Sequence, residues 1–248
     1  MKKNELVLLL SKESSYLVNV KKKKFHTKDG IFLLEELFKK KFGDRIKTHL
    51  GKEFIIAKPS ILDILEKIER LPQIIMPKDL GLILGYTGTG QGSLVVDAGT
   101  GSGFLSLFLA NYVYPGKVVT YENNKKFTRV AKKNIKFSGL KNIRLKQKDI
   151  TKGIDERNVD LITLDLKDAE KVVEHAYKAL KAGGWLVVYS PYIEEVSSVV
   201  KKMEEKGFCN IKTVENIVRE WQVEKYTRPK TIGIMHTGWL TFGRKVVK

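Results

Sequence analysis

The stretch that decides the fold runs from Leu94 to Gly103 and reads LVVDAGTGSG. It begins with a short apolar run, which is typical of a strand buried in a parallel sheet. Glycines then stand at alternate positions, and the apolar spacing of Leu105, Phe108 and Val113 beyond them predicts a helix. Glycine adopts positive φ angles and lets other atoms approach the backbone, so this order favours a ligand at the turn. A purely structural glycine turn is the alternative.

The chain alternates in the same way from about residue 74 onward. We expect further strands at 117–122, 142–147, 159–165 and 184–190, and helices at 124–138, 168–180 and 193–206. Two β runs, 211–218 and 236–246, follow without a helix between them. This alternation predicts an α/β fold whose mostly parallel sheet is covered on both faces, with an antiparallel β pair at the end.

The first residues of the chain have a different pattern. Short β runs fall at 6–10, 16–20 and 53–57, separated by turn-prone pieces. We therefore expect a small β-rich module, such as a partial barrel, over residues 1–58. Ser60 is a suitable N-cap for a helix that links the modules over 59–73. The main domain then spans 74–248.

Acidic residues end the strands that neighbour the glycine turn. Glu122 ends the second strand, Asp149 the third and Asp165 the fourth. Because ligands bind at the carboxyl ends of such strands, and an acidic residue there accepts both ribose hydroxyls, the set indicates a site for S-adenosylmethionine (SAM). A helix cap is the alternative for Asp149. Asp97 either contacts the ammonium group of the methionine part or holds the turn; both interpretations stay open.

The charge of the chain points to its partner. It carries 46 Lys and Arg against 28 Asp and Glu, a net charge of +18, and only eight of the basic residues are arginine. Such a lysine excess favours a polyanion such as nucleic acid. A lysine-rich surface from a heat-loving organism is the alternative, but matching glutamate usually accompanies it.

The cysteine and histidine content and the hydropathy argue against a disulfide-linked, a metal-binding or a membrane-spanning protein. A single cysteine, Cys209, excludes an internal disulfide, and four scattered histidines show no metal-ligand spacing. No stretch approaches the length of a membrane span. We therefore expect a soluble cytoplasmic protein without a metal.

Motifs along nearly the whole chain resemble one known family. They are FHTKDG at 25–30, KTHLG at 47–51, PKD at 77–79, AGTGSG at 98–103, YE at 121–122, LDL at 164–166, REW at 219–221 and HTG at 236–238. In this order they resemble the class I SAM-dependent methyltransferases that methylate N1 of an adenine in the T-loop of tRNA, at position 58 and in archaea also at 57. The resemblance implies a Rossmann-like fold, SAM as cofactor, tRNA as substrate and a homotetramer.

The same resemblance, together with the strand ends, assigns candidate site residues. For the cofactor we expect Asp97, Gly99, Thr100, Gly101, Ser102, Gly103, Phe104, Leu105, Glu122, Asp149, Ile150 and Asp165. For the substrate we expect Met76, Arg219, Trp221, Arg228, His236 and Thr237. A place in the core is the alternative for Trp221, and an ordinary polar contact is the alternative for His236.

Asp165 is the candidate catalytic residue. Adenine N1 has a lone pair, so the main task of such an enzyme is to align the reacting atoms. The methylated base is cationic, and a carboxylate that accepts a hydrogen bond from the N6 amino group stabilises the growing charge. A simple helix cap is the alternative role for Asp165.

The sequence departs from the family pattern at three places. Met76 stands where the family often has an aromatic ring or histidine, Ala169-Glu170 replaces Pro-Trp, and Met235 replaces glycine. These departures concern the target base and not the cofactor.

Two rival functions stay open. One is a class I methyltransferase for a small molecule or protein, and the other is a non-catalytic tRNA-binding subunit, which would not need an intact glycine turn.

Overall fold

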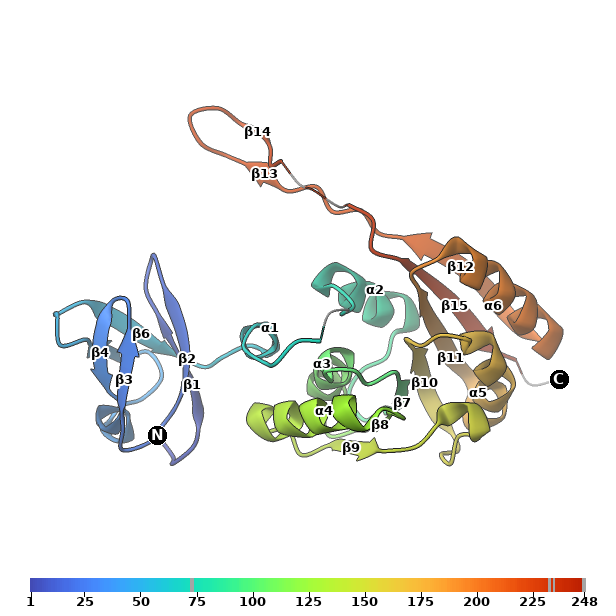
Figure 1. Ribbon diagram of the computed structural model, residues 1–248, viewed down its shortest axis with the longest axis horizontal. Helices are drawn as coiled ribbons and strands as arrows, with labels where there is room; N and C mark the ends of the chain where they lie inside the picture. Colours follow the sequence, from blue (N-terminus) through green and yellow to red (C-terminus); the bar gives the residue numbers. More distant parts are fainter. Residues whose placement is uncertain (72–73, 232, 234, 247–248) are drawn as a thin grey trace. The chain divides into compact units, whose positions relative to one another are not determined.

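The computed structural model describes residues 1–71, 74–231, 233 and 235–246 (Figure 1). Contacts along the chain separate two compact units, Met1–Ile68 and Glu69–Lys248. Each unit has secondary structure and a core of its own. The finer division into 1–58, 59–73 and 74–248 stays a prediction.

The first unit is built from β-strands. Its four-stranded antiparallel sheet has the order β2 (Ser15–Asn19), β1 (Leu6–Leu10), β6 (Glu53–Ala57) and β5 (Arg45–Lys47). A hairpin of β3 (Lys24–Thr27) and β4 (Gly30–Leu33) and a 3-10 helix, η1 (Leu34–Lys39), complete it. The β-rich character was predicted, but β3, β4 and β5 were not. All three strands are short. β3 and β5 carry exposed basic side chains and lack the apolar run that marks a strand, whereas β4 has such a run at 31–33 that continues directly into η1.

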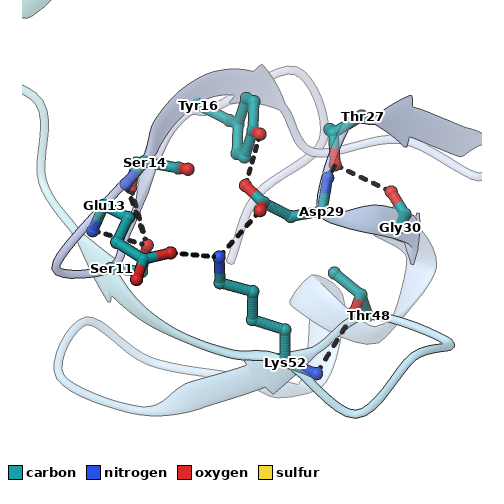
Figure 2. Close-up of polar contacts among 9 residues, drawn as sticks. All are labelled: Ser11, Glu13, Ser14, Tyr16, Thr27, Asp29, Gly30, Thr48 and Lys52. Atoms are coloured by element: carbon teal, nitrogen blue, oxygen red, sulfur yellow. Dashed lines mark hydrogen bonds and ion pairs between the residues drawn. The ribbon is translucent and has the colours of Figure 1, made fainter.

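An aromatic core holds this unit together. Phe32 and Phe54 are fully buried, with ring centroids 5.0 Å apart, and Tyr16 packs against both. The Tyr16 hydroxyl donates to Asp29 Oδ2 (2.6 Å), while Lys52 Nζ donates to Asp29 Oδ1 (2.7 Å) and to Glu13 (2.8 Å). Figure 2 shows how Lys52 joins these acids across separate turns. The network fixes the turns relative to the aromatic core.

The predicted linking helix is much shorter than expected. α1 spans Ile61–Leu65, and Ser60 caps it in a capping box with Asp63. The predicted continuation of the helix was wrong over the described residues 66–71, and residues 72–73 of the predicted range lie outside the described part of the chain. The backbone of Glu69, for example, has other partners. Its N–H donates to Asn134 Oδ1 (3.1 Å), and its carbonyl accepts from Asn134 Nδ2 (2.9 Å). Neither group is then free for a helical ladder.

The second unit contains a seven-stranded sheet. Its order is β12 (Phe208–Glu215), β15 (Trp239–Lys245), β11 (Leu180–Ser190), β10 (Val159–Leu164), β7 (Leu94–Ala98), β8 (Lys117–Tyr121) and β9 (Ile143–Lys146). The strands from β9 to β11 run parallel, and β15 pairs antiparallel with both β11 and β12. The predicted mostly parallel α/β sheet with a terminal antiparallel pair is therefore confirmed.

Helices cover this sheet along its length. α3 (Phe104–Val113) contacts β7 and β8, α4 (Lys125–Ser138) contacts β9, α5 (Val173–Ala179) contacts β11, and α6 (Ile193–Lys206) contacts β11, β12 and β15 (Figure 1). α2 (Pro77–Thr87) precedes β7, and the 3-10 turns η2 (Ile150–Lys152) and η3 (Ala169–Val172) follow β9 and β10. Eight of the ten α3 residues are buried, which its almost wholly apolar sequence requires.

The chain crosses from one side of β7 to the other, which places the ligand site. β8 and β9 follow β7 on one side, and β10 and β11 then pair on the other. The carboxyl ends of β7 and β10 are therefore the switch point of the sheet, where α/β proteins bind ligands. Between β12 and β15 the chain forms a separate hairpin of β13 (Trp221–Gln222) and β14 (Arg228–Pro229). Within the described residues, no helix is long and apolar enough to cross a membrane.

Candidate active site at the carboxyl edge of the sheet

The glycine turn is tied to the end of the neighbouring strand β8. The backbone N–H groups of Gly99 and Thr100 both donate to the carbonyl of Tyr121, at 3.1 and 3.3 Å. The Thr100 hydroxyl donates to the same oxygen (3.0 Å). Gly99, Gly101 and Gly103 all have positive φ, which residues with a Cβ rarely adopt. The turn therefore has one conformation, and only glycine fits its alternate positions without strain.

Gly99 also has no room for a side chain. A Cβ at this position would lie 1.8 Å from the backbone oxygen of Asp165, and the Asp165 N–H donates to the carbonyl of Ala98 (2.8 Å). The backbone at the end of β10 thus lies directly against the turn. This contact brings Asp165 beside the turn, although Gly99 and Asp165 are far apart in sequence.

Asp97 is buried beneath the turn. It is 1% exposed, and its carboxylate accepts hydrogen bonds from Ser106 (2.5 Å), Thr120 (2.8 Å) and Thr163 (2.7 Å). Burial raises its pKa, and the three hydroxyls oppose that shift. These donors come from α3, β8 and β10, so Asp97 joins the elements that surround the turn. Of the two roles left open by the sequence, the geometry supports the structural one.

Glu122 supports the opposite side of the turn. Its carboxylate is 6% exposed and accepts from the backbone N–H of Gly101 (2.9 Å) through Oε2 and from that of Asn124 (2.9 Å) through Oε1. Each carboxylate oxygen has a second lone pair for a further donor. Glu122 can therefore hold the turn and still accept two hydroxyl groups.

Asp149 lies at the end of the segment that follows β9. It is the N-cap of η2, and its Oδ1 accepts from both the N–H (3.0 Å) and the hydroxyl (2.7 Å) of Thr151. These hydrogen bonds lower the pKa of Asp149, so it is a carboxylate at neutral pH. The capping role is therefore present, and it is compatible with a ligand at the other oxygen, Oδ2.

A cavity of about 720 Å³ opens at these residues. Ten of the twelve predicted cofactor residues line it: Gly99, Thr100, Gly101, Ser102, Phe104, Leu105, Glu122, Asp149, Ile150 and Asp165. Asp97 and Gly103 do not line the cavity. Asp97 is enclosed by hydroxyls, and Gly103 is the N-cap of α3, with its N–H bound to the carbonyl of Thr100 (2.7 Å).

Asp165 has an unusual charge environment. Burial, the nearby Asp97 carboxylate and Glu195 together raise the pKa of Asp165 to about 7. Its side chain does not cap the following helix, because Asp168 holds the N-cap position of η3. A carboxyl group that lines a cavity with such a raised pKa is a candidate for a direct role in chemistry.

The predicted substrate residues form two groups, both outside the residues that line the cavity. In the first group, Thr237 donates to Asp79 (3.2 Å) in α2, whose N-cap is Met76. His236 contacts Glu215 through Nδ1, and its ring centroid lies 4.2 Å from that of Trp239. These residues gather where α2 meets the start of β15.

The second group lies on the β13–β14 hairpin. Trp221 is 52% exposed and pairs with Pro229, and the Arg219 guanidinium lies 5.6 Å from the Trp221 ring centroid. Arg228 is exposed on the opposite strand. The alternative of a core position for Trp221 is therefore wrong, since the hairpin has too few neighbours to bury it.

Sequence patterns did not identify Tyr189, which contacts the predicted substrate residue Thr237. Tyr189 is 4% exposed, and its hydroxyl donates to the carbonyl of Thr237 (2.6 Å). Burial raises the pKa of Tyr189, and the nearby charges of Asp165 and Asp79 raise it further. A Cβ on Gly238 would lie 2.6 Å from the Tyr189 ring, so the HTG motif makes room for this ring. The sequence signal that could have identified Tyr189 is its position at the end of a predicted strand, directly before Ser190-Pro191.

The residues present fit SAM. The cavity offers Glu122 for a ribose, a carboxylate at Asp149 for an amino group, and open space beside Gly101, where an added Cβ would meet only a backbone oxygen at 3.8 Å. Among the described residues, no group of three or more His, Cys, Asp or Glu could hold a metal ion. The fold and the site together define a class I SAM-dependent methyltransferase.

Comparison with known proteins gives the family. The family model described as "tRNA methyltransferase complex GCD14 subunit" matches residues 65–233. The tRNA (adenine(57)-N(1)/adenine(58)-N(1))-methyltransferase TrmI of Methanocaldococcus jannaschii is 39% identical, over 92% of this chain and 90% of the relative. The chain belongs to this family of tRNA methyltransferases.

Two solved structures are similar along the whole chain. A SAM-dependent O-methyltransferase from Thermotoga maritima has a TM-score of 0.86 and 34% identity, with 100% of this chain and 95% of that one covered. The tRNA (m1A58) methyltransferase TrmI from Aquifex aeolicus has a TM-score of 0.79 and 27% identity, with 100% and 99% covered. Both similarities cover the first unit as well as the methyltransferase domain.

Gly99→Ala should disable the cofactor site. The added Cβ would collide with the backbone of Asp165, and a positive φ costs about 1–3 kcal/mol for such a residue. We expect SAM affinity, measured by calorimetry, to fall at least about tenfold. Gly90→Ala is the matched control, because its φ is not positive and an added Cβ has no atom within 4 Å. Equal SAM affinity of the two variants would contradict this assignment.

SAM binding should release a proton slightly below pH 7. In the protein without cofactor a large share of Asp165 is protonated there, since its pKa is about 7. The net positive charge of SAM favours the carboxylate form and lowers this pKa. The release should fade as the pH rises above 7, where Asp165 is already ionised. Calorimetry in two buffers of different ionisation enthalpy measures it, and Asp165→Asn should remove the difference; a wild-type heat independent of buffer would refute the linkage.

Proposed function

We propose that this protein transfers the methyl group of SAM to N1 of adenine in tRNA, at position 58 and also at 57. The Asp165 carboxyl group, beside an intact cofactor turn, is the observation that carries the proposal. The M. jannaschii relative, whose name gives both positions, is similar over almost the whole chain and supports the substrate. Positions 57 and 58 lie in the T-loop, which is the part of tRNA that the family resembled by the sequence methylates.

We assign the cofactor contacts to the strand ends. Glu122 accepts the ribose hydroxyls, Asp149 accepts the adenine amino group through Oδ2, and the turn from Gly99 to Ser102 lies against the ligand. Bound SAM supplies an electrophilic methyl group on a sulfonium sulfur. Asp97 acts indirectly, because its three hydroxyl partners hold the elements around the turn.

Asp165 is the proposed catalytic residue. The target N1 already has a lone pair, so no strong base is needed and alignment provides most of the rate increase. The Asp165 carboxylate accepts a hydrogen bond from the N6 amino group of the target adenine and stabilises the positive charge that develops on the base. The charged form is required, and the proximity of SAM favours it.

The target base must leave the stacked RNA to reach this cavity. Thr237 contacts both Tyr189 and Asp79 of α2, and the charge of Asp165 acts on Tyr189. We therefore assign Thr237, its neighbour His236 and the α2 N-cap Met76 to the place where the base enters. On the β13–β14 hairpin, exposed Arg219, Trp221 and Arg228 combine cations with an aromatic ring, a composition suited to phosphate contact and base stacking. The lysine excess of the whole chain also favours binding of the polyanionic tRNA.

An oxygen acceptor is the second candidate, because the similar protein from Thermotoga maritima is named as an O-methyltransferase. Both candidates use the same cofactor site and differ in the atom that is methylated. A non-catalytic tRNA-binding subunit is less consistent with the intact turn and cavity. A homotetramer, implied by the family resemblance, stays a prediction.

Reverse transcription should identify both the atom and the position. The protein is incubated with SAM and an unmodified tRNA transcript, and stops are mapped, since an N1-methyl group blocks base pairing. We expect stops at 58 and at 57. Methyl transfer without any stop would favour the oxygen acceptor, and stops only outside the T-loop would contradict the proposed substrate.

Asp165→Ala should reduce turnover by orders of magnitude, because it removes charge stabilisation at the reacting base. Loss of one such electrostatic group typically costs about 10²–10³ in kcat. tRNA affinity should stay close to the wild-type value, since most of it comes from phosphate contacts. Single-turnover methylation and tRNA binding are measured side by side. A turnover within about threefold of wild type would exclude Asp165 as the catalytic residue.

A further inference from the structure

A second cavity, of about 260 Å³, lies next to the cofactor cavity in the second unit. Lys148 lines both cavities. Further basic side chains come from different elements: Lys152 from η2, Arg157 from the loop before β10, and His175 and Lys178 from α5. We call this set the basic pocket. Its members are separate from the cofactor and target-base contacts assigned above.

The charge of the basic pocket is only partly balanced. Among the described residues that line it, Asp155 is the one acid, and it pairs with Lys148 (2.5 Å). Lys178 pairs with Glu174 (2.7 Å) on the same helix. Lys152 and Arg157 add two further positive charges at the exposed rim. The pocket therefore has a net positive charge that suits an anion.

The Arg157 side chain is held in place by the backbone. Its Nη1 donates to the carbonyls of Ile154 (2.7 Å) and Glu156 (2.8 Å). A guanidinium has five N–H donors in a fixed plane, so these contacts leave its other edge for a ligand. That edge matches the oxygens of a phosphate, which arginine binds through two parallel hydrogen bonds.

The basic pocket also adjoins the wall of the cofactor cavity. His175 Nε2 contacts the carbonyl of Thr151 (3.1 Å), and the N–H and hydroxyl of Thr151 both donate to Asp149. Thr151 lines the cofactor cavity. The basic pocket and the cofactor cavity are therefore joined through Thr151 and Lys148.

We propose that the basic pocket binds a backbone phosphate of the tRNA substrate. This inference rests on the proposed function and adds a specific contact to it. Within the described part of the chain, no Phe, Tyr or Trp lines the pocket, so it has no stacking platform for a nucleobase and fits a phosphate group alone. Gly153, which also lines the pocket, has a φ of +126° and open space at its Cβ position. The exposed rim suits a phosphodiester that remains part of a large polyanion.

The salt dependence of tRNA binding tests this contact. Each phosphate neutralised by a basic residue contributes about 0.7–0.9 to the slope of log affinity against log salt. We expect Lys152→Gln and Arg157→Gln each to bind tRNA more weakly and to reduce the slope by about this amount. Arg157→Lys retains the charge and should keep most of the slope. SAM affinity, measured on the same samples, shows that each variant is folded.

Lys117→Gln is the matched control. Lys117 is exposed and begins β8, at the amino edge of the sheet, opposite the cofactor site, so the same loss of charge should leave the slope and the methylation rate unchanged. Wild-type slopes for both Lys152→Gln and Arg157→Gln would overturn the inference. So would binding of inorganic phosphate that depends on Lys152 without any change in the tRNA slope, since the pocket would then hold a free anion. If the wild-type protein methylates no tRNA, the proposed function itself fails, which is a different result.

Discussion

The contact between the backbones of Gly99 and Asp165 is the constraint on which the site depends. It forces the glycine turn to fold over the carboxyl end of β10, where no side chain could be accommodated at Gly99. The pairing of Asp165 N–H with Ala98 continues the ladder between β7 and β10 to its last residue. As a result, the turn that faces the cofactor and the carboxyl group proposed to face the target base are fixed to each other by main-chain atoms.

Two carboxyl groups near this contact differ because of their hydrogen bonds. Asp97 is buried, but Ser106, Thr120 and Thr163 donate to it and partly offset the cost of its charge. Burial, followed by the charges of Asp97 and Glu195, raises the pKa of Asp165 to about 7, and within the described residues no comparable set of hydroxyls donates to it. One acid can therefore serve the structure, while the other remains responsive to a cation in the cavity.

The parts of this site that were predictable from sequence are those set by strand order. Once β7 was recognised, Glu122, Asp149 and Asp165 followed, because the ends of parallel strands meet at one edge. Tertiary contacts were not accessible in this way. The backbone of Glu69, which the sequence places in a helix, instead pairs with Asn134, a residue of α4 far along the chain. The residue pattern likewise could not choose between the two roles of Asp97, because the hydroxyls that surround it come from three separate elements.

The proposed reaction brings a cationic cofactor and an anionic RNA backbone together, and the second unit has groups suited to each charge. The cofactor and the methylated base are cationic, and carboxyl groups line their cavity at the switch point. The RNA backbone is anionic and too large to enter, so its contacts must lie on exposed surface, where lysine remains hydrated and charged. Lys148 lies on the boundary, since it lines the cavity and the basic pocket and pairs with Asp155. Lys167 and Lys171 also line the cofactor cavity, so basic side chains extend from that cavity to the basic pocket, and phosphate contacts outside the cavity contribute to the affinity for RNA.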